Sequence, residues 1–425
     1  MSDDVAEQQW TIERLVPGGD GLARLPDGRI GFAGGTAPGD VIVVRKAQNK
    51  KSFARAREHS LVAPGPGRVE PECPHARQCG GCDWMHLSRA AELDAKRGVL
   101  TQALQRTGGF RDLPEPGALL TAGEPSGYRS RIRLHVGRSG GLGLYAEHSH
   151  SIVEIKSCLV ASQVVNAGLA RLQRATREHQ ALSRSVGEVE IREADDESLH
   201  FRATPRQGVD PAQAQVAMAA ALGAVSISTV GANTSTDDQV FALTETTQLH
   251  AAPGAFTQVN WDVNRRIIRD ILAEVAHAGA CTFVDLYCGA GNFTLPLLAA
   301  GLSGVGVDIE GAGLRSARRA AKAQGLDERA FVSGDARDCL PLLPDELLPP
   351  DLLLLDPPRS GAKDAIDAMA RLRAKQIAFV SCDPVTLARD AKRLVSHGYE
   401  IASVQGYDMF PRTHHFETLM WLRAT

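Results

Sequence analysis

The sequence between residues 282 and 384 repeats one pattern, a short apolar run that ends in a glycine or a polar residue. The runs are TFVDLYCGAGNF (282–293), GVGVDIE (304–310), the unit that ends in Gly334-Asp335, and DLLLLDPPR (351–359). Short apolar runs of this kind are typical of strands buried on both faces of a parallel sheet. In such sheets, ligands bind at the carboxyl ends of the strands. The pattern therefore predicts an α/β fold whose functional edge is formed by these strand ends.

The glycine loop after the first run favours S-adenosylmethionine over a dinucleotide. Gly289 and Gly291 have no side chain, so a ligand can approach the backbone closely. The third glycine of the dinucleotide pattern GxGxxG is absent, and the loop carries Tyr287 and Asn292. S-adenosylmethionine has no pyrophosphate, so this loop suits it better.

The later strand ends supply acids where a bound nucleoside needs them. Asp308 follows the loop by about twenty residues, where an acid accepts hydrogen bonds from a ribose diol. Asp335 stands at the level of the adenine, and Asp356 ends the fourth strand. Considered alone, the glycine loop is compatible with several nucleotide-binding folds. Asp308 alone is compatible with an ordinary acid at the end of a strand. In this order, the four strand ends predict the Rossmann-like α/β fold of a class I methyltransferase.

The next predicted strand, 376–380, leads directly into SCDP (381–384). Cys382 stands where strand becomes loop, and Pro384 stiffens the exit. A cysteine there is either a nucleophile or a small buried residue. We assign Asp383 no part in activating the thiol, because a neighbouring acid raises a thiol pKa.

An acid in the C-terminal segment completes one possible chemistry. Carbon 5 of uracil is a poor nucleophile, but a thiolate that adds to carbon 6 makes an enolate whose charge reaches carbon 5. After methyl transfer, a base must remove the carbon 5 proton so that the thiol can leave. Cys382 and Glu417, in THHFE, are the residue types required. The alternative is an amino-group methyltransferase, because DPPR resembles a motif of those enzymes, and that transfer needs no thiol.

Four of the eight cysteines form a separate pattern. Cys73, Cys79 and Cys82 have the spacing C-x5-C-x2-C, and Cys158 lies further along the chain. Three close thiols and one distant thiol can surround a tetrahedral site, which suits zinc or an iron–sulfur cluster. The residue types alone do not choose between these metals.

The first sixty residues predict a small all-β domain. Turn signals at 17–21, 26–28, 34–35 and 38–40 separate about five short strands, as in an OB-like barrel. Its basic side chains are either a solvated face or a patch that contacts phosphates. These are Arg45, Lys46, Lys50, Lys51, Arg55 and Arg57.

The middle of the chain predicts a mixed α/β unit that helps to hold substrate. In YRSRIRLHVGR (128–138), Arg129, Arg131 and Arg133 fall on one face of a strand, which could bind phosphate or face solvent. A helix is expected at 87–106 and others at 164–179 and 211–221, with strands at 186–192 and 199–203.

Composition restricts the compartment and the partners. The 425 residues are 43% hydrophobic and 23% charged, with a formal net charge of −3, so a nucleic-acid surface would have to be local. No apolar run has the length of a membrane span, and MSDDVAEQQW lacks the features of a signal peptide. We expect a cytoplasmic protein with no membrane partner.

The motifs FxQxN, DLYCGxGxF, DPPR, SC[ND]P and FPxTxHxE, in this order, resemble those of the RNA uridine-5-methyltransferases. GYRSRIRL continues this likeness, and the glycine pattern with APGD in the first sixty residues resembles the RNA-binding TRAM domain. The resemblance implies Cys382 as nucleophile and Glu417 as base. It also implies cofactor contacts, beyond the glycines, from Gln258, Tyr287, Asn292, Asp308, Asp335 and Asp356.

The same resemblance implies a [4Fe–4S] cluster on Cys73, Cys79, Cys82 and Cys158, with a structural role because methyl transfer needs no electron. The implied domains are a TRAM-like barrel (1–63), a central domain (64–86 and 112–252) and a methyltransferase domain (87–111 and 253–425). The barrel and cluster favour the branch that acts on 23S rRNA, as a monomer and not on DNA. The alternatives are the same reaction on tRNA, or a non-catalytic RNA-binding or assembly factor.

Overall fold

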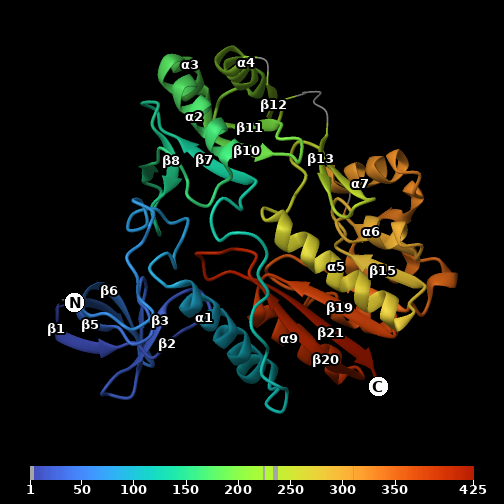
Figure 1. Cartoon of the computed structure of the whole chain (residues 1–425), viewed down its shortest axis with the longest axis horizontal. Coiled ribbons are helices and arrows are strands. Elements are labelled where there is room, and N and C mark those ends of the chain that lie inside the picture. The colour runs from blue at the N-terminus through green and yellow to red at the C-terminus, as the bar shows by residue number, and fades with distance from the viewer. Residues whose placement is uncertain (1–3, 224, 233–237, 310) are drawn as a thin grey trace.

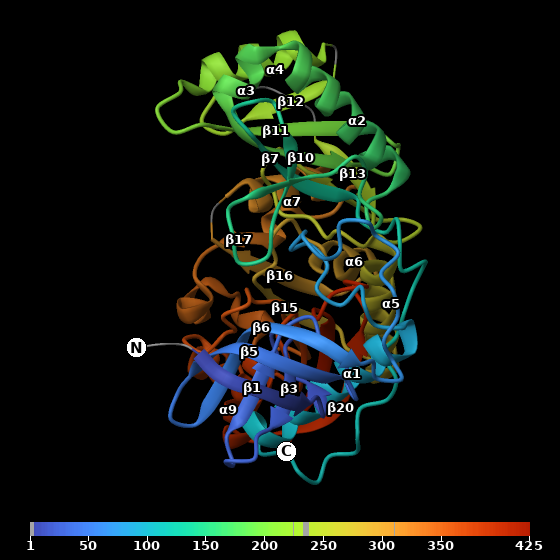
Figure 2. The same cartoon turned by 90° about the vertical axis from the view of Figure 1, so that its left-hand side faces the viewer.

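This computed structural model describes residues 4–223, 225–232, 238–309 and 311–425. Residues 1–3 of the predicted barrel, and 224 and 233–237 of the predicted central domain, lie outside the described residues. The described strands form three large sheets and one hairpin (Figure 1). The central sheet forms an upper tier, while the N-terminal and C-terminal sheets lie beside each other below it (Figure 2).

The N-terminal sheet has six strands rather than the five expected. They are β1 (Asp4–Thr11), β2 (Arg14–Leu15), β3 (Gly21–Arg24), β4 (Ile30–Ala33), β5 (Val41–Asn49) and β6 (Phe53–Ala63), in the order β1-β5-β6-β4-β3-β2. Trp10, Ile42 and Val44 form part of its core. Gly31 is required there, because a Cβ would lie 2.8 Å from the Trp10 ring. Strands β1 and β2 are the edges, so strand pairing alone does not establish the predicted barrel closure.

The central sheet carries helices on one face (Figure 1). Its strands are β7 (Arg131–Val136), β8 (Leu142–Tyr145), β9 (Ile152–Glu154), β10 (Val186–Glu193), β11 (Leu199–Pro205) and β12 (Ser226–Thr229), in the order β12-β11-β10-β7-β8-β9. The helices are α2 (Gln163–Glu178), α3 (Gln180–Ser185) and α4 (Pro211–Leu222). Leu134, Leu169 and Phe201 are fully buried between the sheet and these helices.

Part of the predicted arginine face is neutralised. Glu190 on β10 lies 3.9 Å from Arg131 and 3.4 Å from Arg133, while Glu188 lies 3.4 Å from Arg133. These acids enter from a strand more than fifty positions away, so the arginine pattern alone could not reveal them. Arg129 and Arg133 both line a cavity together with the four predicted metal-ligating cysteines.

The C-terminal sheet has the order β17-β16-β15-β18-β19-β21-β20. Its strands are β15 (Thr282–Leu286), β16 (Ser303–Asp308), β17 (Phe331–Ser333), β18 (Leu352–Leu355), β19 (Gln376–Ser381), β20 (Tyr399–Tyr407) and β21 (Glu417–Ala424). Strands β15 to β19 are parallel, whereas β21 runs antiparallel to both of its neighbours. A hairpin of β13 (Gln239–Ala242) and β14 (Gln248–Ala251) precedes this sheet.

Helices cover both faces of the C-terminal sheet, which explains its continuously apolar strands. Leu353 and Leu355 pack in one core with α1 (Arg89–Gln102), α8 (Ile366–Arg371) and α9 (Pro384–Ser396). Leu352 and Leu354 pack in the other core with α5 (Trp261–Ala278), α6 (Thr294–Ala299) and α7 (Ala312–Ala323). Short helical turns occupy 103–108, 328–330, 336–338, 340–342 and 345–347.

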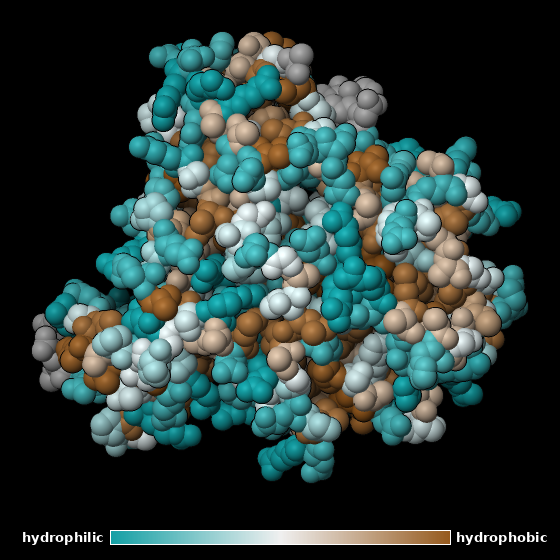
Figure 3. Space-filling view, viewed as in Figure 1, coloured by the Kyte–Doolittle hydropathy of each residue, from teal (hydrophilic) through white to brown (hydrophobic). Residues whose placement is uncertain are grey.

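Hydrophilic side chains predominate on the face shown in Figure 3, with hydrophobic ones gathered mainly over the C-terminal sheet. Among the described helices, none combines the length and apolarity that crossing a bilayer requires.

Candidate active site

The glycine loop after β15 is held by one of the predicted cofactor ligands. Gly289 and Gly291 have φ angles of 55° and 87°, and a Cβ at Gly291 would lie 3.0 Å from Leu295. The Gly289 N–H donates to Asp308 Oδ2 over 2.7 Å, and the Ile309 N–H donates to Asp308 Oδ1 over 2.7 Å. Asp308 therefore fixes the loop shape, in addition to any contact with a ribose.

The other predicted cofactor residues lie around the same edge but have different partners. The Asn292 amide exchanges two hydrogen bonds with Asn264 on α5, at 2.8 and 3.0 Å. Asp335 accepts hydrogen bonds from Arg337. Burial, with Asp335 as a second cause, raises the pKa of Tyr287 to about 12. Gln258 is half-buried in a segment that the Ser130 N–H pins through Val259 O at 3.0 Å.

Sequence reasoning missed Asp285, a carboxyl group inside β15. The side chain is fully buried; its Oδ2 accepts from Thr294 Oγ1 at 2.5 Å, and its Oδ1 has no hydrogen-bond partner. Burial raises its pKa to about 8. A buried acceptor without a donor, beside the glycine loop, fits a ligand with positively charged groups such as S-adenosylmethionine. The signal in the sequence was an acid within an otherwise apolar strand.

The thiol and the acid are brought together by strand register. Asp383 caps α9 by accepting from the Val385 and Thr386 N–H groups at 3.0 and 2.8 Å, which ends β19 at Ser381. Ser381 pairs with Thr418 in the antiparallel ladder between β19 and β21. One further step in this register sets Glu417 opposite Cys382, although the two lie far apart in the sequence.

Arg359 is a third member of this group, and sequence reasoning did not assign it a role. Burial, followed by the nearby Glu417, raises the pKa of Cys382 to about 12, while the positive charge of Arg359 opposes this rise. Burial, followed by the nearby Asp356, raises the pKa of Glu417 well above its usual range, and Arg359 opposes this shift. Burial raises the pKa of Asp356 to about 7. The site thus gathers a thiol, two carboxyls and one guanidinium.

Two histidines connect this site to the cysteine loop. Arg359 Nη2 donates to His415 Nε2 at 3.3 Å, and burial lowers the pKa of His415 to about 3. The neighbouring His414 bonds through its N–H and its Nδ1 to the carboxylate of Asp83, which follows Cys82. A continuous set of contacts therefore runs from the cysteine loop to Arg359.

Cys73, Cys79, Cys82 and Cys158 line one cavity of about 180 Å³, between the cysteine loop and the central sheet. This agrees with the predicted grouping of the four thiols. Within the described residues, however, no group of three or more His, Cys, Asp or Glu side chains has the arrangement needed to hold a metal ion. The predicted cluster is therefore not confirmed.

The strand order, the helices on both faces and the glycine loop next to an acid at the end of β16 define a class I methyltransferase. Comparison with known proteins narrows this class. The profile of the family described as tRNA (Uracil-5-)-methyltransferase matches residues 350–425, which include Asp356, Cys382 and Glu417.

Two relatives match nearly the whole chain. The 23S rRNA (uracil(1939)-C(5))-methyltransferase RlmD of Pectobacterium atrosepticum is 33% identical over 423 residues, covering 96% of this chain and 92% of its own. An uncharacterized RNA methyltransferase of Gloeobacter violaceus is 32% identical, covering 97% and 96%. The crystal structure of the Pyrococcus abyssi tRNA (uracil-54, C5)-methyltransferase has the same fold, with a TM-score of 0.77, 24% identity and coverage of 97% and 99%.

This chain belongs to the S-adenosylmethionine-dependent RNA uracil-5-methyltransferases, of the RlmD type.

Proposed function

We propose that the protein forms 5-methyluridine in 23S rRNA, with Cys382 as the nucleophile and Glu417 as the base. The observation that carries this proposal is the convergence of Cys382, Glu417 and Arg359 at the ends of β19 and β21. Relatives that match nearly the whole chain and are named as 23S rRNA enzymes support the choice of substrate. The protein acts in the cytoplasm as a monomer, and DNA is not a substrate.

The proposed reaction begins at the thiol. Cys382 loses its proton to solvent water, and the positive charge of Arg359 stabilises the resulting thiolate. The thiolate adds to carbon 6 of the uracil, and the electron pair of the carbon 5–carbon 6 double bond moves to carbon 5 and its neighbouring carbonyl. S-adenosylmethionine, when bound, supplies the methyl group that carbon 5 receives.

Glu417 completes the proposed cycle. As a carboxylate it takes the proton from carbon 5, the double bond re-forms, and the bond between carbon 6 and the Cys382 sulfur breaks. The buried environment raises the pKa of Glu417, so ionisation needs the help of Arg359. Gln258, Tyr287, Gly289, Gly291, Asn292, Asp308, Asp335 and Asp356 are the proposed contacts of the methyl donor.

The four cysteines are proposed to hold a [4Fe–4S] cluster with a structural role. Four sulfur donors around a single cavity support this choice. Iron and acid-labile sulfide in anaerobically purified protein, with absorbance in the visible range, are expected. Stoichiometric zinc without iron would overturn the assignment.

The proposal also divides the chain into three domains. They are a barrel (1–63), a central domain (64–86 with 112–252) and a methyltransferase domain (87–111 with 253–425). The N-terminal sheet is proposed to be a TRAM-like barrel that contacts RNA. Lys50 and Lys51 are exposed and support this role, whereas Lys46 and Arg55 form ion pairs with Glu58 and Asp20.

The decisive test is methyl transfer from labelled S-adenosylmethionine to unmodified 23S rRNA and to unmodified tRNA, with mapping of the product nucleotide. Label at carbon 5 of a uridine in 23S rRNA is the expected result. Label only in tRNA would support the proposed mechanism but identify tRNA, and not 23S rRNA, as the substrate. No label in either RNA, with the methyl donor bound, would favour a non-catalytic assembly factor. Activity that persists in Cys382→Ala would favour amino-group transfer.

A further inference from the structure

A cavity of about 300 Å³ lies where the N-terminal sheet meets the helices of the C-terminal sheet. One wall belongs to the N-terminal sheet, which lies beside α1 (Figure 1), and its lining includes Arg14, Pro17 and Phe32. The opposite wall includes Arg106, in the helical turn that follows α1, and Val385, in the first turn of α9. The cavity therefore joins two parts of the chain that the sequence analysis treated separately.

Two arginines give this cavity a positive charge. Arg14 and Arg106 line it, and no Asp or Glu occurs among its described lining residues. Burial, followed by the nearby guanidinium of Arg106, lowers the pKa of Arg14, so the two cations repel each other. Outside the lining, Glu13 lies 3.8 Å from Arg14, but it also lies 3.4 Å from Arg24. One shared acid leaves an excess of positive charge, and an anion between the two lining arginines would relieve their repulsion.

Most of the remaining lining is apolar and includes one aromatic ring. Phe32, on β4, is half-buried. Two residues of β6 hold its ring in place, because Phe53 and Arg55 lie 5.9 and 5.6 Å from the ring centroid. A fixed aromatic ring is a stacking surface for a base of any type. The volume is at the lower end of the range of about 300–1,000 Å³ that is typical of small-ligand sites, which suits a single nucleotide.

The cavity lies close to the proposed nucleophile. Val385 is three positions after Cys382, so their Cα atoms are at most about 11 Å apart. On the facing wall, Pro17 belongs to the turn that carries Gly19. A Cβ at Gly19 would lie 3.2 Å from Nδ1 of His414, in the histidine pair of the active site. Both walls therefore lead to the active site, and an RNA strand whose uridine reaches the thiol can place a neighbouring nucleotide in the cavity.

We propose that this cavity binds one nucleotide of the RNA strand that flanks the target uridine, with its phosphate between Arg14 and Arg106 and its base against Phe32. This inference rests on the proposed function, because it assigns part of the path of that substrate. When the target uridine leaves its stack, the neighbouring base loses a stacking partner, and Phe32 replaces that partner. Neither arginine belongs to the basic side chains that the sequence analysis singled out in the first sixty residues.

The test compares Arg14→Gln/Arg106→Gln with a control of equal charge, Arg184→Gln/Arg329→Gln, whose arginines are exposed and do not line the cavity. Binding to unmodified 23S rRNA and tRNA transcripts is measured over a range of salt concentrations. We expect weaker binding of the substrate RNA, with a slope of log K against log salt that is smaller in magnitude by about 1 than in the control. The Kd for S-adenosylmethionine and the Tm should match the control.

Two further variants separate the charge and the stacking from the attachment of the N-terminal sheet. Gln102→Leu removes the side chain that accepts from Arg14 Nε at 3.0 Å but keeps both charges, so it should retain the salt slope of the wild type. Phe32→Leu should weaken RNA binding by about 5-fold or more without a change in slope. A slope that falls equally in Gln102→Leu and in the double arginine variant would overturn the proposal, because attachment of the sheet would then explain both.

An RNA affinity and salt slope equal to those of the control would also overturn the proposal. So would binding of free uridine monophosphate that depends on Arg14 and Arg106 while RNA affinity does not, since the cavity would then be a site for a free nucleotide. Because binding needs no turnover, the two proposals fail separately. If the wild type methylates neither RNA but the arginine and Phe32 variants still lose RNA affinity, the proposed function is wrong and the nucleotide site stands.

Discussion

At the scale of single residues, one guanidinium, that of Arg359, affects the protonation of both groups that the proposed reaction needs. It lowers the pKa of Cys382 and opposes the rise in the pKa of Glu417. Its position is fixed in turn by His415, which burial keeps neutral and therefore able to accept. In the proposed reaction, the thiol and the acid are ionised at different steps. The fixed positive charge of Arg359 stabilises whichever of the two is negatively charged.

Removing this charge should shift the titration of Cys382 upward. The thiol pKa is already about 12, so alkylation by iodoacetamide in the free protein should be slow at neutral pH and rise only in alkaline solution. Arg359→Ala should move this rise to higher pH, because the thiolate loses the nearby positive charge that stabilises it. Labelling of the peptide that contains Cys382, followed by mass spectrometry across pH, measures the shift. An unchanged profile, equal to that of Arg329→Ala, would contradict the role of Arg359.

Glu417→Gln should separate the two halves of the proposed reaction. The amide cannot take the carbon 5 proton, so the bond between Cys382 and carbon 6 should persist after methyl transfer. A protein–RNA adduct that survives denaturing gel electrophoresis is the expected readout, with turnover lower by about 100-fold or more. Cys382→Ala is the matched control and should form no adduct. An adduct that is absent in Glu417→Gln while RNA binding persists would show that another group is the base.

At the scale of elements, the active site depends on a contact between two loops that are more than 300 positions apart. Asp83 accepts from the His414 N–H at 3.1 Å and bonds its Nδ1, and the Trp84 N–H donates to Arg412 O at 3.1 Å. The cysteine loop thus supports the segment that carries His415 and leads into β21. A structural cluster in that loop would stabilise the catalytic geometry without taking part in the chemistry.

Asp83→Ala should therefore lower kcat without loss of the proposed cluster on the four cysteines. Misplacement of His415 and Arg359 by a fraction of an ångström to an ångström costs up to about 100-fold in rate. Iron content and the visible spectrum should be unchanged, and kcat should fall more than RNA affinity. Glu70→Ala, which removes an exposed acid paired with Arg77 in the same region, is the control. Equal kcat values for the two variants would contradict this prediction.

A buried ion network anchors α1 to the same catalytic segment. Lys96 is fully buried and donates to Glu92 at 2.8 Å and to Asp408 at 2.5 Å. Lys96→Met should lower the free energy of unfolding by about 3 to 5 kcal/mol, because it removes the fully buried cation between two buried acids and leaves Arg89 as their remaining ion-pair partner. Denaturant unfolding measures this loss, and Lys51→Met, at an exposed position, should leave stability unchanged. A loss below about 1 kcal/mol would indicate that water or Arg89 replaces the ammonium group.

The sequence predicted these elements where local pattern decides them and failed where a distant partner does. The run Leu352–Leu355 is apolar because alternate residues enter two cores, so its strand was predictable. The pairing of Arg131 with Glu190 and of Arg359 with Cys382 depends on strand order, which periodicity does not encode. Asp285 was missed because a single acid does not interrupt an apolar strand pattern.

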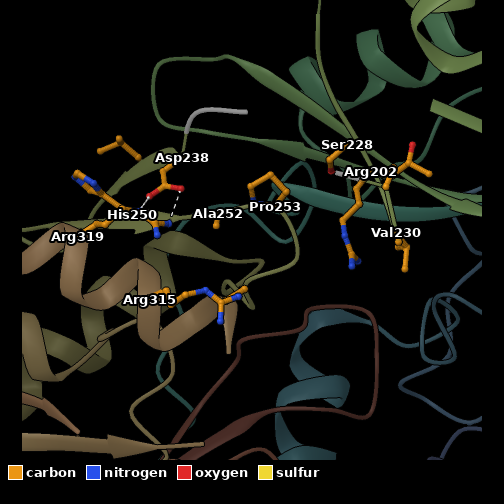
Figure 4. A pocket seen from close by; sticks show the side chains of 14 residues that line it. Arg202, Ser228, Val230, Asp238, His250, Ala252, Pro253, Arg315 and Arg319 are labelled. Carbon is orange, nitrogen blue, oxygen red and sulfur yellow. Dashed lines mark hydrogen bonds and ion pairs between the residues drawn. The ribbon is translucent and has the colours of Figure 1, made fainter. Parts of the chain in front are cut away.

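At the scale of the whole molecule, hydrogen bonds from loops and strand ends tie the sheets to one another. The Trp84 side chain donates to Gly19 O at 3.0 Å and Arg14 donates to Gln102 at 3.0 Å, so the N-terminal sheet is tied to the cysteine loop and to α1. The central sheet is tied to the segment of Gln258 through Ser130. A cavity of about 760 Å³, lined by Arg202 of β11 and Ala312 of α7 among others, lies where the upper and lower tiers face each other (Figure 4).

The insertion of β21 between β19 and β20 also sets an order of events during protein synthesis. A growing chain delivers the strand of Cys382 first, then β20, and only afterwards the strand that begins with Glu417. Until that strand arrives, β19 is an open, apolar sheet edge and β20 has no neighbour to pair with. The proposed nucleophile is therefore made before the proposed base. Docking of one late strand closes the sheet and makes the enzyme competent in the same step.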